Sequence, residues 1–299
     1  MRRVRMLGWL ILAVLAVSAS IAACNGDPGY NEEELILATT TSLNDSGLLD
    51  ELVPIFEAEH DVRVKIIAVG TGAALRMGVD GNADVLLTHA PASELELVNA
   101  GDVTRRTLVA YNDFVIVGPV HDPAVIAGMR DAAIALANIS AFCVGGPCEF
   151  ASRGDDSGTH KKELSLWADV DIDPQNEGRD WYLEVGQGMS ATLTVANQRG
   201  AYTLTDRGTY LALLEDIPEL VVLVEGDSRL LNFYSVMEVN GDKGRINTRA
   251  SRSFADFLAR EDIQAMIGEY LRSEYGRPLF IPAAGDSEKA ISARGGAAD

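Results

Sequence analysis

Short apolar runs alternate with helix-like stretches along the first third of the chain. The apolar run 35–38 precedes residues 46–59, where large apolar side chains recur three or four positions apart. Residues 62–69 and 84–88 read as further strands, with the short helical pattern 72–79 between them. Because strands that alternate with helices usually form a parallel sheet covered by those helices, this region predicts an α/β fold with a mainly parallel sheet.

The same alternation returns in the middle of the chain and again near its end. Helical patterns at 159–168 and 190–197 are followed by the apolar run 220–224. Residues 234–239 then predict another strand, and 252–270 show long helical periodicity. A second set of strands and helices is therefore expected, able to form a core of its own.

The order of these patterns predicts that the chain passes between two lobes twice. We assign residues 35–114 together with 232–282 to lobe 1, and residues 115–231 to lobe 2. Each lobe is expected to be a mainly parallel sheet flanked by helices. Two α/β lobes joined by two crossings leave a cleft, and α/β folds bind ligands where strands end and helices begin.

The chain begins with the layout of a bacterial secretory signal. Three arginines within the first five residues precede the apolar stretch 7–17, which is short for a membrane helix. The stretch leads to Ile-Ala-Ala-Cys, which resembles a lipobox, the site where a cysteine receives lipid. We expect residues 1–23 to be a lipoprotein signal peptide. The exported protein would then be anchored by lipidated Cys24 to the outer face of the cytoplasmic membrane, periplasmic or at the cell surface.

Polar segments flank the region that is expected to fold. Residues 24–34 carry glycine and proline without apolar periodicity, and we interpret them as a tether. Residues 283–299 are rich in alanine, glycine and charge, and we expect a disordered tail there. The length between them suits two domains, each with its own core.

The formal net charge of −19 excludes one class of partner. Such a surface repels nucleic acid, and no basic patch offsets it. It also opposes the approach of any anion from a distance. Nearby donors in a cleft can still hold an anion, because fields beyond roughly 10 Å are screened by salt.

Four segments at expected strand-to-helix transitions consist largely of hydroxyl residues and glycine: 39–42, 70–73, 152–160 and 186–192. Helix starts expose unpaired N–H groups and the positive end of the helix dipole, so they bind anions readily. Helix capping alone accounts for any single segment. Four together favour a shared ligand.

Arg153 is the cation among these segments. It can neutralise a bound anion and donate two parallel hydrogen bonds. The alternative is a surface salt bridge to Asp155 or Asp156.

The strings Thr-Thr-Thr-Ser, Ser-Arg-Gly-Asp-Asp-Ser-Gly-Thr-His-Lys-Lys-Glu and Gly-Gln-Gly-Met-Ser-Ala-Thr-Leu occur in this order. Together they resemble the periplasmic tungstate-binding family of bacterial ABC transporters, over about residues 35–282. The resemblance implies a type II periplasmic-binding-protein fold that holds a dehydrated oxyanion in the interlobe cleft and delivers it to an ABC permease, without a cofactor. The ligand contacts that it implies are Thr41, Ser42, Thr71, Gly72, Arg153, Ser157, Thr159, Ala191 and Thr192.

Tungstate is the first candidate ligand, with molybdate and phosphate as alternatives. Tungstate and molybdate are nearly identical in size and charge. Phosphate keeps a proton at neutral pH and favours an acceptor in its site, which Asp155 or Asp156 could supply.

A hydrolase that uses the same cleft is the alternative from another class. Ser157 beside His160 could suggest a nucleophile and base, but no Gly-x-Ser-x-Gly elbow is present. The histidines are scattered without metal-ligand spacing, so no metal site is expected. We therefore expect a binding protein and not an enzyme.

Cys143 and Cys148 flank a Gly-Gly-Pro turn in a chain that is expected to be exported. A turn there could bring their Cα atoms within the roughly 4.4–6.8 Å that a disulfide requires. Two separate buried thiols are the alternative.

Overall fold

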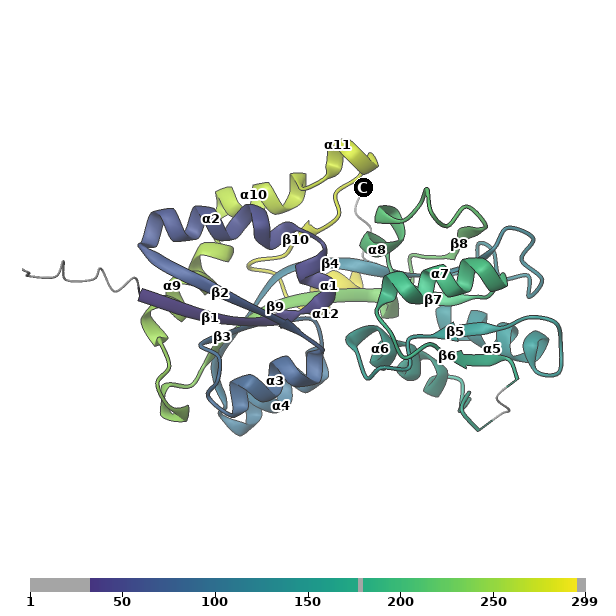
Figure 1. Ribbon diagram of the computed structural model, residues 1–299, viewed down its shortest axis with the longest axis horizontal. Helices are drawn as coiled ribbons and strands as arrows, with labels where there is room; N and C mark the ends of the chain where they lie inside the picture. Colours follow the sequence, from purple (N-terminus) through teal and green to yellow (C-terminus); the bar gives the residue numbers. More distant parts are fainter. Residues whose placement is uncertain (1–32, 177–179, 295–299) are drawn as a thin grey trace, which may run out of the picture. The chain divides into compact units, whose positions relative to one another are not determined.

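The computed structural model describes residues 33–176 and 180–294 (Figure 1). The expected signal peptide, Cys24 and nearly all of the tether lie outside these residues. The chain divides into two units, residues 1–33 and 34–299, and the fold described below is that of the second unit. Within the described ranges, no helix has the length and apolar character needed to cross a membrane.

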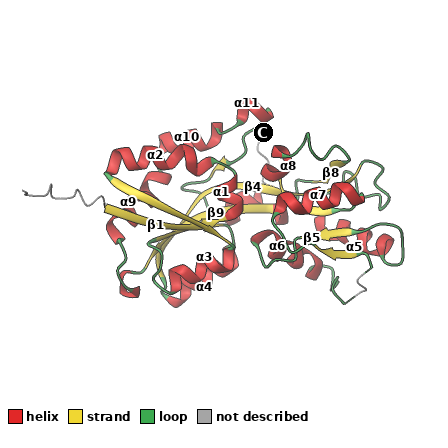
Figure 2. Ribbon diagram, viewed as in Figure 1, coloured by secondary structure: helices red, strands yellow, loops and turns green. Residues whose placement is uncertain are grey.

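Lobe 1 is built from elements at both ends of the folded chain. Its elements are β1 (Glu33–Thr40), α1 (Thr41–Asp45), α2 (Leu48–His60), β2 (Val62–Val69), α3 (Thr71–Val79), β3 (Val85–Thr88), α4 (Pro91–Ala100), the first part of β4 (Val103–Pro119), β9 (Leu231–Val239), α9 (Thr248–Leu258), α10 (Glu261–Glu269), α11 (Arg272–Tyr275) and β10 (Ile281–Pro282). Helices cover both faces of this sheet (Figure 2). Alternation along β1 explains this, because Leu35 and Leu37 pack with α2 and α9, whereas Ala38 packs with α3.

Lobe 2 is built from the intervening elements. They are the second part of β4, α5 (Ala132–Cys143), β5 (Phe150–Ser152), α6 (Gly158–Ala168), β6 (Tyr182–Glu184), α7 (Met189–Arg199), β7 (Thr203–Asp206), α8 (Arg207–Ala212), β8 (Leu220–Val224) and the 3-10 turn η1 (Ser228–Leu230). A second 3-10 turn, η2 (Gly241–Lys243), belongs to lobe 1. The lobe 2 core includes Trp167, Trp181 and Phe150, whose rings make edge-to-face contacts.

Strand β4 belongs to both lobes. Its first part, from Val103 to Asp113, pairs with β9, and from Phe114 onward it pairs with β7 and β8. The chain thus leaves lobe 1 along β4 and returns along β9. The expected domain boundaries stay a prediction, but the change of strand partner between residues 113 and 114 gives them a physical location.

The strand directions differ from those expected. The order is β10-β4-β9-β3-β1-β2, with β7 and β8 attached to β4. Strands β1 and β3 are parallel, as are β5 and β6, whereas β9 runs antiparallel to both β3 and β4. The fold is two-lobed α/β as expected, but its sheets are mixed and not mainly parallel. The physical reason is that the outgoing and returning crossing strands lie side by side, and β9 inserts next to β3.

The prediction of a disordered tail from residue 283 is wrong for the described part. Helix α12 (Glu288–Ala293) packs on the crossing strands, with Ile291 buried against side chains of β4 and β9. Glu288 forms an ion pair with Arg106 of β4. One buried isoleucine and one ion pair anchor a segment whose composition alone indicates no order.

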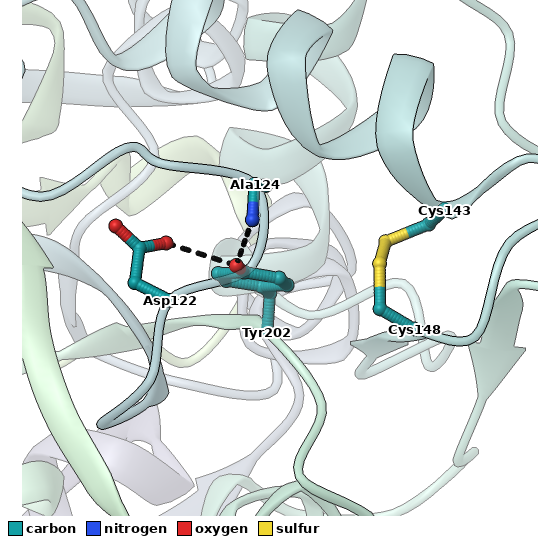
Figure 3. The surroundings of a disulfide bond; sticks show 5 residues. All are labelled: Asp122, Ala124, Cys143, Cys148 and Tyr202. Carbon is teal, nitrogen blue, oxygen red and sulfur yellow. Dashed lines mark hydrogen bonds between the residues drawn. A yellow bond between two sulfur atoms is a disulfide. The ribbon is translucent and has the colours of Figure 1, made fainter.

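Cys143 at the end of α5 is joined to Cys148 in a disulfide, with Cα atoms 4.8 Å apart (Figure 3). Nearby, the Tyr202 hydroxyl accepts from the Ala124 N–H at 2.8 Å and donates to Asp122 at 2.9 Å. These contacts tie the loop that follows β4 to the lobe 2 core.

Candidate functional site

A cavity of about 160 Å³ lies where several helix starts meet. This is below the ~300–1,000 Å³ of pockets for drug-sized ligands, so it suits a small ligand. Its walls come from the starts of α1, α7 and α8, the loop after β5, the crossing strands, and the segment around α11. The lining residues include Thr41, Ser42, Asp45, Asn112, Arg153, Gly188, Met189, Ser190, Asp206, Gly208, Thr209 and Tyr234.

The start of α1 contributes hydroxyl groups. Thr40 is its N-cap, and its side-chain oxygen accepts from the Leu43 N–H at 3.4 Å. Thr41 is exposed and lines the cavity. Ser42 also lines it, and the Ser42 hydroxyl lies 3.2 Å from Nε2 of His89. Thr40 therefore caps the helix, and neither Thr41 nor Ser42 is needed for that role.

Arg153 supplies the positive charge of the cavity. It follows β5 directly, is only 6% exposed and forms an ion pair with Asp155. Its Nε has no hydrogen-bond partner among the described residues. Buried N–H groups are nearly always paired. An unpaired N–H at Arg153 is therefore free to donate to an acceptor atom of a bound ligand. The salt bridge that was the alternative for Arg153 is present, but it uses the guanidinium without satisfying Nε.

Hydrogen bonds to buried side chains of lobe 2 anchor the loop that carries Arg153. Ser152 accepts from the Gly154 N–H at 3.2 Å and bonds Oε2 of Glu163 at 2.8 Å. Burial raises the pKa of Glu163 to about 7, against the hydrogen bonds from Tyr182, Ser152 and Trp167, which lower it. Lobe 2 thus fixes the position of the cation through a buried, hydrogen-bonded carboxyl.

The starts of α6 and α3 face each other. Ser157 caps α6 by accepting from the His160 N–H at 3.3 Å, and Thr159 is buried in its first turn. Thr71 is buried in the first turn of α3, and a Cβ placed on Gly72 would lie 3.6 Å from Oδ2 of Asp156. These residues border the site but do not line its cavity, so their contact with a ligand stays a prediction.

The start of α7 reaches the cavity one turn earlier than expected. Gly188, Met189 and Ser190 line it, whereas Thr192 is buried and donates to the Gly188 carbonyl at 3.1 Å. The role expected of Ala191 and Thr192 likewise stays a prediction, and Ser190 is the better-placed hydroxyl.

Known proteins resemble this chain in sequence and fold. A family model for the PBP superfamily domain matches residues 22–262. The tungstate-binding protein TupA of Peptoclostridium acidaminophilum is 44% identical, covering 91% of this chain and 96% of that protein. The chain belongs to the TupA family.

Two solved structures of relatives agree with this fold. The tungstate-binding protein TupA from Desulfovibrio alaskensis G20 matches with a TM-score of 0.73 and 43% identity, covering 84% of this chain and 99% of that one. The structure described as the tungstate ABC transporter from Geobacter sulfurreducens matches with a TM-score of 0.70 and 44% identity, over 80% and 99% of the two chains. The first relative is described as a tungstate-binding protein and the second as a tungstate ABC transporter, and both share the fold of this member of the TupA family.

Sequence reasoning missed part of the cavity of this TupA-family chain. Asp206, Gly208 and Thr209 lie at the transition from β7 to α8. Their composition is that of the four segments singled out from the sequence, so the same criterion could have found them. Asn112 and Tyr234 had no such signal, because they lie within the crossing strands and join the site only through the topology.

The chemistry of the site does not resemble that of a hydrolase. The Ser157 oxygen accepts from the backbone of His160, and Nδ1 of His160 accepts from the Asp156 N–H. No contact joins the two side chains as nucleophile and base, whereas catalysis requires one. Nor do the described residues contain a group of His, Cys, Asp and Glu side chains that could hold a metal ion.

Proposed function

We propose that this protein is the extracytoplasmic solute-binding component of an ABC importer and that its cavity captures tungstate, with molybdate as the alternative. The observation that carries this is Arg153, a buried cation with an unpaired N–H that lines a small cavity together with Ser42 and Ser190. Such a set of donors matches a fully ionised tetrahedral oxyanion. The names of the relatives support the same ligand.

Capture requires donors from both lobes. Ser42 belongs to lobe 1, whereas Arg153 and Ser190 belong to lobe 2. We propose that the lobes close on the ligand by bending at β4 and β9, and that the closed form is delivered to the permease. The other predicted contacts, Thr71, Gly72, Ser157, Thr159, Ala191 and Thr192, would then approach the oxyanion or support the residues that do.

Calorimetric titration tests the ligand. The chain from residue 25 onward would be titrated separately with tungstate, molybdate, phosphate and sulfate. Tungstate should bind most tightly, or equally with molybdate, and phosphate and sulfate should bind far more weakly. Tighter binding of phosphate would assign Asp206, which lines the cavity, as the acceptor for its proton.

The signal peptide and the lipid on Cys24 are proposals of the same kind. Replacement of Cys24 by Ser removes the thiol that would carry the lipid, so palmitate labelling of cells should be lost and the protein released from the membrane. The double variant Cys143→Ser with Cys148→Ser is the control, because it removes the two cysteines of lobe 2 together, leaves no new free thiol and should keep the label. Undiminished labelling of Cys24→Ser would overturn the anchor.

A further inference from the structure

His89 is buried where the two lobes meet. It follows β3 of lobe 1, and the whole residue is only 7% exposed. One ring edge meets Ser42 and the other meets Asn232 of β9. Its face meets lobe 2, because a Cβ placed on Gly158 would lie 2.7 Å from its Cε1. The imidazole therefore touches a cavity-lining hydroxyl, a crossing strand and the start of α6.

Hydrogen-bond accounting assigns the proton on this ring. The Asn232 amide donates through Nδ2 to Oδ1 of Asn112 at 2.9 Å and to the Tyr234 hydroxyl at 2.8 Å. Both amide hydrogens are thereby used, so Oδ1 of Asn232, 2.9 Å from Nδ1 of His89, accepts a hydrogen from that nitrogen. A neutral imidazole has a single N–H, which leaves Nε2 as an acceptor.

The Ser42 hydroxyl is consequently turned away from the ligand. It lies 3.2 Å from Nε2 of His89 and 3.3 Å from the Thr40 hydroxyl. Because Nε2 can only accept, the single Ser42 hydrogen is assigned to that nitrogen, and the Thr40 hydroxyl donates to Ser42. With the hydrogen on this bond, the serine presents only oxygen lone pairs to the cavity. Lone pairs repel a dianion, so this arrangement opposes the binding that the cavity otherwise favours.

The charges around His89 keep it neutral before binding. Burial lowers the pKa of the imidazole most, the Asn232 hydrogen bond and Asp206 raise it, and Arg153 and Lys162 lower it further. The Tyr234 ring, 5.1 Å away between centroids, stays a neutral phenol because burial raises its pKa. An oxyanion in the cavity would add negative charge next to this set and favour the imidazolium.

We propose that His89 is a positioning residue that takes up one proton from solvent when the oxyanion binds, so that Ser42 can donate to the ligand. With Nε2 protonated, N–H donates to Oγ of Ser42, and the serine hydrogen is released toward the oxyanion. Nδ1 keeps its bond to Asn232 throughout. This inference rests on the proposed function of the cavity as an oxyanion site.

Linkage sets the sign of the pH dependence. Because the ligand raises the pKa of His89, binding is accompanied by proton uptake at any pH between the pKa of the free protein and that of the complex. Affinity should therefore increase as pH falls through this window, by at most tenfold per pH unit. Above and below the window, the affinity should not depend on pH through this group.

Proton uptake can be measured directly by titrating tungstate at pH 7 in buffers of different ionisation enthalpy. The observed heat should vary linearly with the buffer enthalpy, with a slope that corresponds to a substantial fraction of one proton. In His89→Gln the slope should vanish while tungstate still binds, because an amide N–H donates to Ser42 without titrating. His121→Gln is the matched control, since His121 is exposed, and should retain the slope of the parent.

Ser42→Ala provides a second variant that does not alter the buried ring. It removes the hydroxyl that couples the ring to the ligand, so tungstate should bind more weakly and with a reduced slope. Proton uptake by the bound oxyanion itself would occur in every variant. A slope that persists in His89→Gln would therefore identify the oxyanion, and not His89, as the group that takes up the proton.

The outcomes separate this inference from the proposed function. Tungstate binding by the parent without proton uptake would overturn the role of His89 and leave the oxyanion site intact. Equal uptake by His89→Gln and the parent would do the same. Absence of any tungstate heat in the parent, at any pH, would refute the oxyanion site itself.

Discussion

Arg153 combines a charge, burial and an unpaired donor in one side chain of the cavity. Its guanidinium is held by Asp155, and its backbone carbonyl accepts from the Gly186 N–H at 2.8 Å, so the cation is fixed before a ligand arrives. Preorganised donors lose little entropy on binding, and charged hydrogen bonds are stronger than neutral ones. At the scale of single residues, this side chain should dominate the affinity.

Truncation of Arg153 tests that expectation. Loss of a buried charged hydrogen bond costs on the order of 2–5 kcal/mol, so Arg153→Ala should weaken tungstate binding by at least about thirtyfold in calorimetry. Thr41→Ala removes one neutral donor and should cost roughly 0.5–1.5 kcal/mol. Arg252→Ala, at an exposed arginine of α9, should bind like the parent. If Arg153→Ala binds as tightly as the parent, the ion pair with Asp155 is the whole role of Arg153.

Glu163 makes the stability of the protein depend on pH. Its pKa is raised to about 7, so between the unfolded value and about pH 7 the folded state holds the proton that the unfolded state has lost. The contribution of this group to stability is therefore lost as pH rises through that range. Glu163→Gln should remove the loss, and its stability relative to the parent should increase by about 2–4 kcal/mol between pH 5 and pH 8. Urea unfolding at both pH values measures this, and a constant difference would contradict it.

At the scale of elements, the strand-to-helix transitions were readable from the sequence and the strand partners were not. The start of α1 and the loop before α6 carry local signals, namely hydroxyl residues, glycine and a change of apolar period. The antiparallel placement of β9 between β3 and β4 has no local signal, because a buried strand reads the same whichever neighbour it pairs with. Asn112 and Tyr234 line the cavity because of that pairing, so they could not be predicted from the sequence.

Helix α12, at the end of the chain, is a second element that could not be predicted from the sequence. Alanine, glycine and charge predict disorder, yet a single apolar side chain, Ile291, is buried on the crossing strands. Ile291→Ser should cost about 2–4 kcal/mol of stability, by analogy with other losses of a buried isoleucine, or detach the helix. Ala290→Ser, exposed on the same helix, should change little. Urea unfolding and hydrogen exchange at residues 288–293 distinguish the two variants, and equal behaviour would favour the disordered tail.

At the scale of the whole molecule, the net charge of −19 and the ligand have the same sign. The long-range field therefore repels an approaching oxyanion, whereas Arg153 and the helix starts attract it only at short range. Salt screens charges beyond about 10 Å at 0.1 M and much less within the cavity. Added salt should consequently weaken the repulsion more than the capture.

The rate of association should accordingly increase with ionic strength, opposite to the usual behaviour of electrostatically steered binding. Stopped-flow mixing with tungstate, followed by tryptophan fluorescence, should show a faster second-order rate at 150 mM than at 10 mM sodium chloride, while the dissociation rate changes less. Sodium acetate in place of chloride controls for competition by the added anion, because acetate is not a tetrahedral oxyanion. A rate that falls with salt would mean that the field of Arg153 extends beyond the cavity and guides the ligand despite the acidic surface. The acidic charge would then lie mainly away from the entrance, and the approach of the oxyanion would be governed by the local field that the helix starts and Arg153 create.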